Sequence, residues 1–465
     1  MAPMSKRALL VFVLLTTLLS CAATVSAAQP DRGTHVPTMV IDEGGVVRVS
    51  SEGYLEERFV VPGNLVPKLK EMAEGRSLRV KGWPVSPGDH RTIRIERRSV
   101  YGSKTRIFEV GENGRRELPR SAHLHFVGEI DGEPGSGVLV ILDPRSGRFQ
   151  GLTVSDGVTF DLLPVDGGAA SEVKVVATHE RMAADDPHWG CGEESLDSSP
   201  MLLTRGPLSG FDDMAKAGSP VEAILAIDTD VELLTQKFLG STSAATDYIA
   251  DLIAAMNVMY SRDLNVTLVQ GTTILRTASD PYTAAGGAAS STELSEFRNY
   301  WAANYGSVPR ALAAMLSGTS SSSYSASGIA WLGGLCSTSF GYSFSKVFKT
   351  NYLSGDAKLV GHEIGHNFGS PHTHCYSPPI DTCWNQECYT GTTSCPGGPG
   401  TVMSYCHLTG CGSTLDFHPT VIDNILTNNV APATGVCLFA SSASDDLFDD
   451  GFERGSTSSW SSSVP

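Results

Sequence analysis

The chain has 465 residues, of which 41% are hydrophobic and 18% are charged, and its formal net charge is −16. This length accommodates two domains with sizeable cores, and the composition excludes a mainly disordered chain. The acidic balance argues against a surface that neutralises phosphates, so we expect no nucleic-acid partner.

The N-terminus has the pattern of a secretory signal peptide over residues 1–27. Two basic residues precede an apolar run at 8–20, and small residues up to Ala27 form a cleavage site. The run is too short for a permanent membrane span, and no later apolar stretch is long enough. We therefore expect a secreted protein without a membrane span. Lipoprotein cleavage, which would leave a lipid anchor on Cys21, is the alternative.

The segment that follows, to about residue 190, has a β-rich pattern. Short strand-like runs lie at 92–96, 123–127 and 137–142, separated by turn signals such as Asp131-Gly132. From about 192 to 219 the periodicity ends and Ser, Gly, Asp and Pro dominate, which predicts a linker. Arg205 and Lys216 are candidate processing points within it.

A second domain is predicted from residue 220. Apolar runs at 221–227, 264–268 and 311–316 predict strands, whereas the helical spacing of apolar residues predicts helices at 245–260 and 293–304. Strands that alternate with helices indicate an α/β sandwich. The last residues, 441–465, are rich in Ser and Asp and predict a disordered tail or the remnant of a sorting signal.

The segment 362–372 fits H-E-x-x-H-x-x-G-x-x-H at every fixed position. On a helix, His362 and His366 lie one turn apart and can direct their ring nitrogens to one point. Gly369 can take the positive φ of a helix C-terminus, and the turn it makes brings His372 to the same point. Three histidines that leave a fourth position open are typical of a catalytic zinc site.

Glu363 lies about 100° round the helix from the first histidine, so it is not placed to be a third ligand. It can instead reach a water molecule held by the metal and act as a general base. A lone H-E-x-x-H also occurs by chance, but here every position of the longer motif matches.

A second feature, Thr401-Val402-Met403-Ser404-Tyr405, follows 29 residues after His372. Its Met403 would form a soft apolar floor beneath the histidines.

Eight of the ten cysteines lie between residues 336 and 437. Their even number and close spacing predict four disulfides formed in an oxidising compartment. The spacing does not determine which cysteines pair.

The extended motif and Met403 resemble those of the metzincin zinc metallopeptidases, and within them the adamalysin/reprolysin group is the most similar. Asn367, the stretch 328–336 and the strand with Glu222 carry the resemblance to that group. It covers 220–440 well and extends more loosely, over 85–165, to the reprolysin-type propeptide.

The resemblance implies an α/β (α+β) catalytic domain with a twisted, mostly parallel five-stranded sheet and a C-terminal subdomain braced by disulfides. It also implies that this domain follows a β-rich, inhibitory propeptide. The expected order is a signal peptide (1–27), a propeptide (28–205) with a linker to about 219, a catalytic domain (220–440) and a tail (441–465).

In such families the substrate binds as an added strand at the sheet edge, here Gly328 to Gly333. The resemblance further implies a Cys336–Cys437 disulfide and, because Glu222 matches one ligand, a structural calcium ion beside the catalytic zinc ion.

Two positions depart from or extend the group's pattern. Thr373 stands where adamalysins usually have Asp, so a buried contact of that Asp is lost or replaced. Tyr405 follows the Met-turn as it does in astacins and serralysins. It is either a fifth metal ligand that stabilises the oxyanion or a residue that lines the S1′ wall.

Cys191, within Trp189-Gly190-Cys191-Gly192, precedes the predicted linker. Its position resembles a cysteine switch, in which a thiolate occupies the fourth zinc position and keeps the precursor latent. The alternative is an unpaired or partner-seeking cysteine.

We therefore expect a secreted zinc endopeptidase that is made as a latent zymogen, with its own propeptide as an intramolecular inhibitor and extracellular proteins as substrates. The alternative is a catalytically silent binding or adhesion protein with the metzincin fold, and the intact Glu363 disfavours it. A serralysin- or astacin-like enzyme is a further alternative, but the calcium-binding repeats of serralysins are absent from the sequence.

Overall fold

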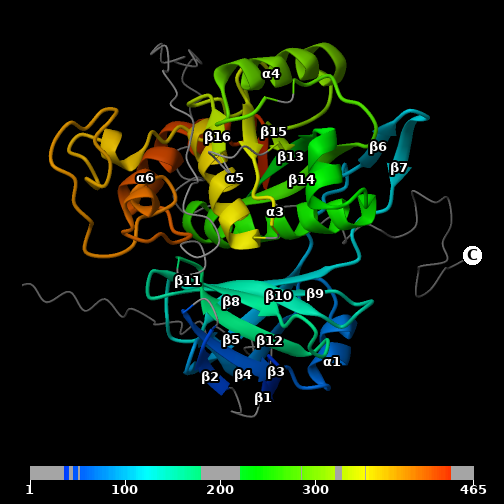
Figure 1. The fold of residues 1–465 in the computed structure, drawn as a ribbon, viewed down its shortest axis with the longest axis vertical. Coiled ribbons are helices and arrows are strands. Elements are labelled where there is room, and N and C mark those ends of the chain that lie inside the picture. Colours follow the sequence, from blue (N-terminus) through cyan, green and yellow to red (C-terminus); the bar gives the residue numbers. More distant parts are fainter. Residues whose placement is uncertain are drawn as a thin grey trace, which may run out of the picture. The chain divides into compact units, whose positions relative to one another are not determined.

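The computed structural model describes residues 36–40, 46–50, 53–179, 220–283, 285–319, 327–350 and 352–440. The predicted signal peptide, Cys191, the linker and the tail lie outside these described residues. The described residues from Pro37 onward belong to one compact unit, and their strands form two sheets (Figure 1). Within the described ranges, no helix is both long and apolar enough to cross a bilayer.

The first sheet is built by the N-terminal part of the chain. Its strands are β1 (Thr38–Val40), β2 (Val46–Val49), β3 (Leu55–Val60), β4 (Ser77–Ser86), β5 (Asp89–Arg98), β8 (Leu124–Ile130), β9 (Gly137–Leu142), β10 (Phe149–Ser155), β11 (Val158–Pro164) and β12 (Glu172–Ala177). Their order is β1-β4-β5-β8-β9-β10-β11-β12-β3-β2, and the helix α1 (Leu65–Glu71) follows β3 in the chain. The strand-like runs predicted from the sequence fall on β5, β8 and β9.

Strand β9 is buried on both faces, because successive side chains point to opposite sides of a sheet. Val138, Val140 and Leu142 belong to the core of the first sheet itself. Leu139 and Ile141 belong instead to a second core, which they share with helix α3 (Thr242–Leu264). The N-terminal sheet therefore packs one face against helix α3.

The second sheet contains β13 (Val221–Thr229), β14 (Val266–Arg276), β15 (Leu312–Ser317), β16 (Ser327–Ala330), β17 (Tyr342–Lys346), β18 (Leu438–Ala440) and the hairpin β6 (Ile107–Gly111) and β7 (Gly114–Leu118). Its order is β16-β17-β15-β13-β14-β6-β7, with β18 paired to β13. β17, β15, β13, β14 and β6 run parallel, whereas β16 is antiparallel to β17. This sheet has more strands than the predicted five because β18 pairs with β13 and the hairpin from the N-terminal part pairs with β14 (Figure 1).

Helices cover both faces of the second sheet, as expected for an α/β sandwich. Alternate side chains of strand β15 point to the two faces of the sheet. Leu312, Ala314 and Leu316 share a core with α3 and α5 (Leu353–Asn367). Ala313 and Met315 share the opposite core with α4 (Ser291–Tyr305) (Figure 1). Shorter helical segments complete the C-terminal part: η1 (Leu233–Lys237), η2 (Thr373–Cys375), η3 (Cys406–Thr409), α6 (Pro419–Ile425), η4 (Leu426–Val430) and α7 (Ala431–Ala433).

Helix α3 and strand β14 both extend further than predicted. The helix continues past Tyr260 to Leu264 and ends at Asn265, whose left-handed φ of 53° directs its N–H back to the Tyr260 carbonyl. Asn and Gly are the residues that take this conformation most readily. The strand then begins at Val266, two residues later than predicted, and continues to Arg276 rather than ending at Leu268.

Four disulfides link the eight cysteines of residues 336–437 within the described residues, in agreement with the cysteine count. Cys336–Cys437 is the pair that the resemblance implied. The other three, Cys375–Cys388, Cys383–Cys406 and Cys395–Cys411, lie between residues 375 and 411. That segment has little regular structure, so cross-links replace the hydrogen-bonded elements that would otherwise order it.

Candidate metal centre

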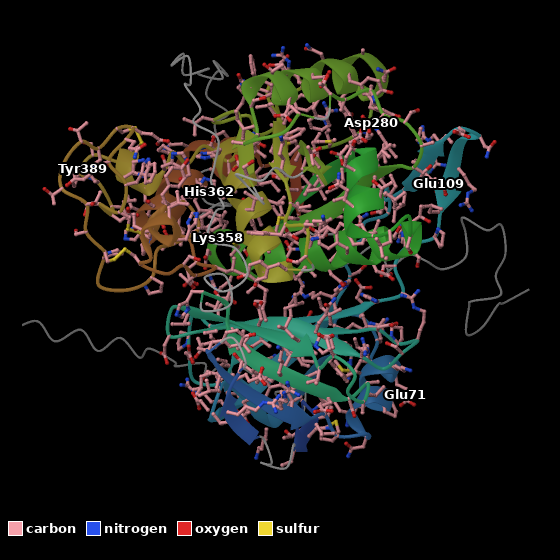
Figure 2. The ribbon with its side chains drawn as sticks, viewed as in Figure 1. Glu71, Glu109, Asp280, Lys358, His362 and Tyr389 are labelled. Carbon is pink, nitrogen blue, oxygen red and sulfur yellow. A yellow bond between two sulfur atoms is a disulfide. The ribbon has the colours of Figure 1, made fainter. Side chains whose placement is uncertain are left out.

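Helix α5 carries the first part of the motif and is buried along its whole length. His362 and His366 lie one turn apart on it, with ring centroids 4.7 Å apart (Figure 2 labels His362, and Lys358 one turn before it). Gly365 permits the close packing behind these rings, since a Cβ there would lie 2.5 Å from the Met403 sulfur.

The turn after α5 brings the third histidine back to the first two. Gly369 has a φ of +90° and donates its N–H to the His366 carbonyl at 2.8 Å. A side chain at this position would be strained by that φ and would also meet Asn429. The chain therefore reverses here as predicted, and His372 follows.

The three imidazoles converge on one point. The nearest nitrogens of His362, His366 and His372 all lie within 4.8 Å of one another. The Nε2 atoms of His366 and His372 are 3.1 Å apart. His362 Nε2 is buried and has no hydrogen-bond partner among the described residues. A shared metal ion would satisfy this buried atom.

Each imidazole is fixed by its other nitrogen. Nδ1 of His362 donates to the Val402 carbonyl at 2.7 Å, and Nδ1 of His366 donates to the Ser370 carbonyl at 2.8 Å. Nδ1 of His372 contacts the Glu387 carboxylate at 2.8 Å. Because these oxygens only accept, each Nδ1 carries the proton and each Nε2 presents a lone pair, which is the tautomer that a metal requires.

Burial also keeps these rings neutral. It lowers the pKa of His362 well below its ordinary value, and the neighbouring histidines lower it further. The pKa of His366 falls to about 3, first through burial and then through His372. Burial lowers the pKa of His372 as well, against the opposing effect of Glu387. The donor set of three neutral imidazoles fits zinc.

Glu363 lies on the same helix next to the first ligand and is fully buried. Its carboxylate packs over strand β16, where a Cβ on Gly328 would lie 2.3 Å from Oε1. The glycine thus leaves the space in which this carboxylate sits. Glu363 therefore lies beside His362 and against strand β16, and its role as general base stays a prediction.

Met403 and Tyr405 lie in the segment that contacts the histidines and helix α5. The backbone around Met403 holds the ligands, since Val402 accepts from His362 and Met403 accepts from the Thr373 N–H at 3.0 Å. The ring of Tyr405 lies 4.3 Å from the His372 ring and is buried. The structure therefore brings both predicted residues to the three histidines.

The edge of the sheet is tied to the end of α5. Asn367 donates its side-chain amide to the carbonyls of Trp331 and Tyr342 at 2.8 and 3.1 Å. The Gly333 N–H donates to the His366 carbonyl at 2.8 Å. Strand β16 and the residues after it are thus fixed beside the metal centre, and β16 pairs with a single described strand.

Glu387 is a site residue that sequence reasoning missed. Its carboxylate contacts His372 and also His374, whose Nε2 is 2.9 Å away. Burial alone would raise the pKa of Glu387, but hydrogen bonds from the two histidines outweigh it and leave the pKa lowered. Only its position beside Cys388 sets it apart in the sequence, and no spacing rule links it to the motif.

Two other nearby histidines have different partners. His407 Nδ1 lies 3.3 Å from the Lys358 ammonium, and His418 caps helix α6 by accepting from the Thr420 N–H. Cys191 lies outside the described residues. Glu222 lies on β13, and its assignment as a calcium ligand stays a prediction.

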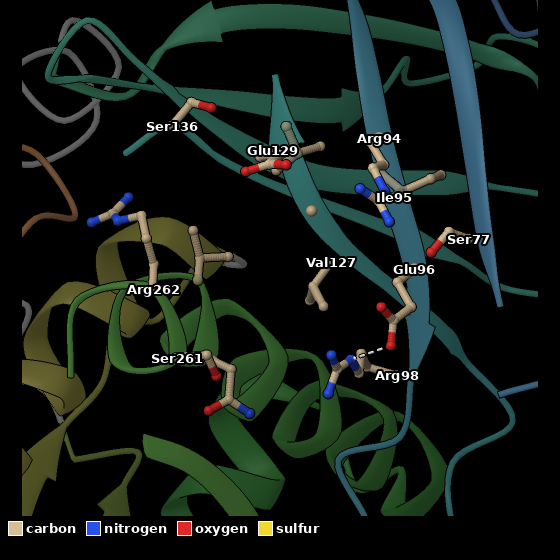
Figure 3. A pocket seen from close by; sticks show the side chains of 14 residues that line it. Ser77, Arg94, Ile95, Glu96, Arg98, Val127, Glu129, Ser136, Ser261 and Arg262 are labelled. Carbon is tan, nitrogen blue, oxygen red and sulfur yellow. Dashed lines mark ion pairs between the residues drawn. The ribbon is translucent and has the colours of Figure 1, made fainter. Parts of the chain in front are cut away.

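A separate cavity of about 320 Å³ lies between strands β5 and β8 and helix α3 (Figure 3). Arg94, Glu129 and Arg262 are among its lining residues, and none of the motif residues is. This cavity is therefore distinct from the metal centre.

One family of known proteins matches the segment that contains this site. Residues 221–415 match the model of metallo-peptidase family M12, Reprolysin_5. No curated protein matches the chain. Among solved structures, the crystal structure of metalloproteinase-II from Bacteroides fragilis is similar, with 14% sequence identity, a TM-score of 0.36, and coverage of 66% of this chain and 85% of that chain. The family match includes the three convergent histidines, and together these findings support a metzincin-like metallopeptidase.

Proposed function

We propose that the protein is a secreted, zinc-dependent endopeptidase that hydrolyses peptide bonds in extracellular proteins. The observation that carries this proposal is the convergence of three histidine rings beside a buried glutamate. Three histidine ligands are characteristic of zinc sites that keep a position open for chemistry. The disulfides support an oxidising, extracellular location.

The site residues would have separate roles in the hydrolysis. A zinc ion held by His362, His366 and His372 would lower the pKa of a water molecule and polarise the scissile carbonyl. Glu363 would accept the proton of the attacking water and pass it to the leaving amine. Its position against Gly328 supports this role, because the close packing limits how far the carboxylate can move.

The substrate would bind as an extended strand along Gly328 to Gly333. This proposal is supported by β16, which lies at the end of the sheet order and pairs with β17 on one side only among the described strands. An extended peptide can use the free backbone groups of such an edge. The contacts of Asn367 and Gly333 would hold this edge in register with the metal centre.

Tyr405 would serve the site in one of two ways. A hydroxyl that stabilises the oxyanion predicts that Tyr405→Phe lowers kcat, whereas a ring that lines the S1′ wall predicts an unchanged kcat. The ring packs on His372 at 4.3 Å, which agrees with both roles. Comparing kcat of the wild type and Tyr405→Phe on one peptide distinguishes them.

The full chain would be a latent zymogen in which Cys191 occupies the open metal position. The place of Cys191 just before the predicted linker supports this proposal, since a thiolate is a ligand that zinc accepts. Cys191→Ser is therefore expected to raise the activity of the precursor or to make it process itself. A variant that stays as latent as the wild type would count against the switch.

Metal removal tests the proposal directly. The chain, cut within residues 192–219 to relieve latency, should lose cleavage of a denatured protein substrate when zinc is stripped with a chelator. Added zinc should restore it. Activity that survives complete removal of zinc would refute a zinc peptidase.

A further inference from the structure

The third histidine of the metal centre is held differently from the first two. His362 and His366 are fixed by the buried helix α5, and their Nδ1 atoms donate to backbone carbonyls. His372 lies after the turn at Gly369, and its Nδ1 contacts a side chain, the Glu387 carboxylate. The direction of this ring therefore depends on where Glu387 stands.

One oxygen of Glu387 serves two histidines. Oε2 lies 2.8 Å from His372 Nδ1 and 2.9 Å from His374 Nε2. The two imidazole rings are stacked, with centroids 5.4 Å apart and an angle of 11° between their planes. His374 thus fixes the carboxylate from the side, and the carboxylate in turn fixes His372.

A disulfide closes this arrangement. Cys375 directly follows His374, Cys388 directly follows Glu387, and the two cysteines are bonded to each other. Between η2 and η3 the chain has no described helix or strand that would otherwise position Glu387. The disulfide therefore joins the residues that directly follow His374 and Glu387, whose side chains are hydrogen-bonded to each other.

We propose that Glu387 is the positioning residue for the third metal ligand, and that the Cys375–Cys388 disulfide holds it in place. The affinity of the centre for its metal then depends on this one disulfide. The inference rests on the proposed function only in that His362, His366 and His372 bind a metal ion. Carboxylates that hydrogen-bond to a metal-ligating histidine raise its basicity and fix its tautomer.

A second metal ion is the rival explanation of this cluster. His372, His374, Cys375 and Glu387 are grouped closely enough to hold an ion. However, the Cys375 sulfur is bonded to Cys388 and is not a free thiolate. The positioning role predicts one zinc ion per chain, and the rival predicts two.

The test measures zinc affinity by competition with a chelator, in full-length protein that carries Glu363→Ala so that it does not digest itself. Glu387→Ala should weaken zinc binding about 10- to 100-fold and change the visible absorption of the cobalt-substituted protein. Glu387→Gln, which keeps the size of the side chain and an acceptor oxygen, should show a smaller loss. Glu71→Ala, an exposed glutamate at the end of α1, is the control and should match the parent (Figure 2).

The disulfide is tested by the paired change Cys375→Ser/Cys388→Ser, which should weaken zinc binding about as much as Glu387→Ala. Cys395→Ser/Cys411→Ser removes another cross-link of the same region and is the matched control. Adding Glu387→Ala to the first pair should cause little further loss, because both changes release the same ring.

Zinc affinity of Glu387→Ala and Glu387→Gln within twofold of the parent would overturn the proposal, as would two zinc ions per parent chain. Full additivity of the glutamate and disulfide changes would overturn the part played by the disulfide. Cleavage is not measured in this series, so a chain that binds zinc but hydrolyses nothing would refute the proposed function alone.

Discussion

Hydrogen bonds and burial act together on each imidazole of the metal centre. Burial lowers the pKa of all three histidines, so they are neutral at physiological pH before any metal arrives. The acceptor on each Nδ1 then fixes which nitrogen carries the lone pair. A site prepared in this way does not have to lose protons to bind a metal ion.

Gly328 controls the position of Glu363, and Gly328→Ala tests this. A Cβ would lie 2.3 to 2.5 Å from three atoms of the glutamate side chain, so the carboxylate has to move. We expect kcat to fall about 10- to 100-fold while zinc content is unchanged. The assay compares kcat and zinc content with those of Gly398→Ala, where a Cβ meets no atom within 4 Å. Equal kcat for the two variants would contradict the close packing.

Among the individual residues of the site, those whose spacing follows from helix geometry could be predicted from the sequence. His362, Glu363 and His366 share one helix, and the glycine turn that delivers His372 also has a local cause. Glu387 and the carbonyls of Val402 and Ser370 could not be predicted. They reach the histidines through loops whose course is set by disulfides, and cysteine spacing alone does not give connectivity.

At the scale of elements, helix α5 is anchored at its first turn by a buried carboxylate. Asp356 accepts hydrogen bonds from Lys237 Nζ at 3.0 Å, from the Tyr248 hydroxyl at 2.8 Å and from the Phe348 N–H at 2.8 Å. These donors come from η1, from α3 and from the segment after β17. The helix that carries two of the proposed metal ligands is thereby joined to three other segments of the chain.

Asp356→Ala should lower the free energy of unfolding by about 3–5 kcal/mol, because it leaves the Lys237 ammonium buried without its carboxylate. Denaturant unfolding in the Glu363→Ala background measures the change. Asp423→Ala, an exposed aspartate on α6, is the control. A loss below about 1 kcal/mol would show that the buried pair does not anchor the helix.

Helix α3 shows where element prediction reached its limit. The apolar spacing at 245–260 correctly predicted a helix, and an amphipathic helix normally exposes its polar face. Here Asp251 and Asn257 are buried as well. Asn257 exchanges hydrogen bonds with the Leu268 backbone, and Asp251 contacts His123 and His125 of the N-terminal sheet. A periodicity does not reveal that a distant sheet covers the polar face.

In the chain as a whole, the contacts of Asp251 with His123 and His125 join the N-terminal sheet to helix α3. Burial alone would lower the pKa of His123, but the hydrogen bond and charge of Asp251 outweigh it and raise this pKa. Asp247 and Asp143 act in the same direction. The stabilisation from protonated His123 is therefore complete below its ordinary pKa of about 6.5 and is lost as the pH rises through the raised value.

We expect the stability of the full chain to fall more between pH 6.5 and pH 9 than that of the variant His123→Gln. Denaturant midpoints measured across this range, with Glu363→Ala in both proteins, give the comparison. The burial of Asp251 would raise its pKa, but hydrogen bonds from the two histidines lower it, so its own contribution is lost only in acid. Parallel pH profiles for the two proteins would contradict the role of His123.

The β6–β7 hairpin joins the two parts through the backbone. Residues 107–110 of β6 pair in parallel with the second half of β14, so the N-terminal part supplies strands to the second sheet. The strand-like pattern of the N-terminal segment was predictable from its sequence. Its pairing with a strand more than 150 residues later was not, because strand partners at such distances depend on tertiary packing.

We propose that the protein hydrolyses peptide bonds with Glu363 as the general base beside three zinc-binding histidines. The most direct test compares the wild type with Glu363→Ala, both cut within residues 192–219, on a denatured labelled protein, with the zinc content of each sample measured. We predict one zinc ion in each protein and cleavage that falls at least about 100-fold in the variant. Equal cleavage by the two proteins, or none by a zinc-loaded wild type, would contradict the account.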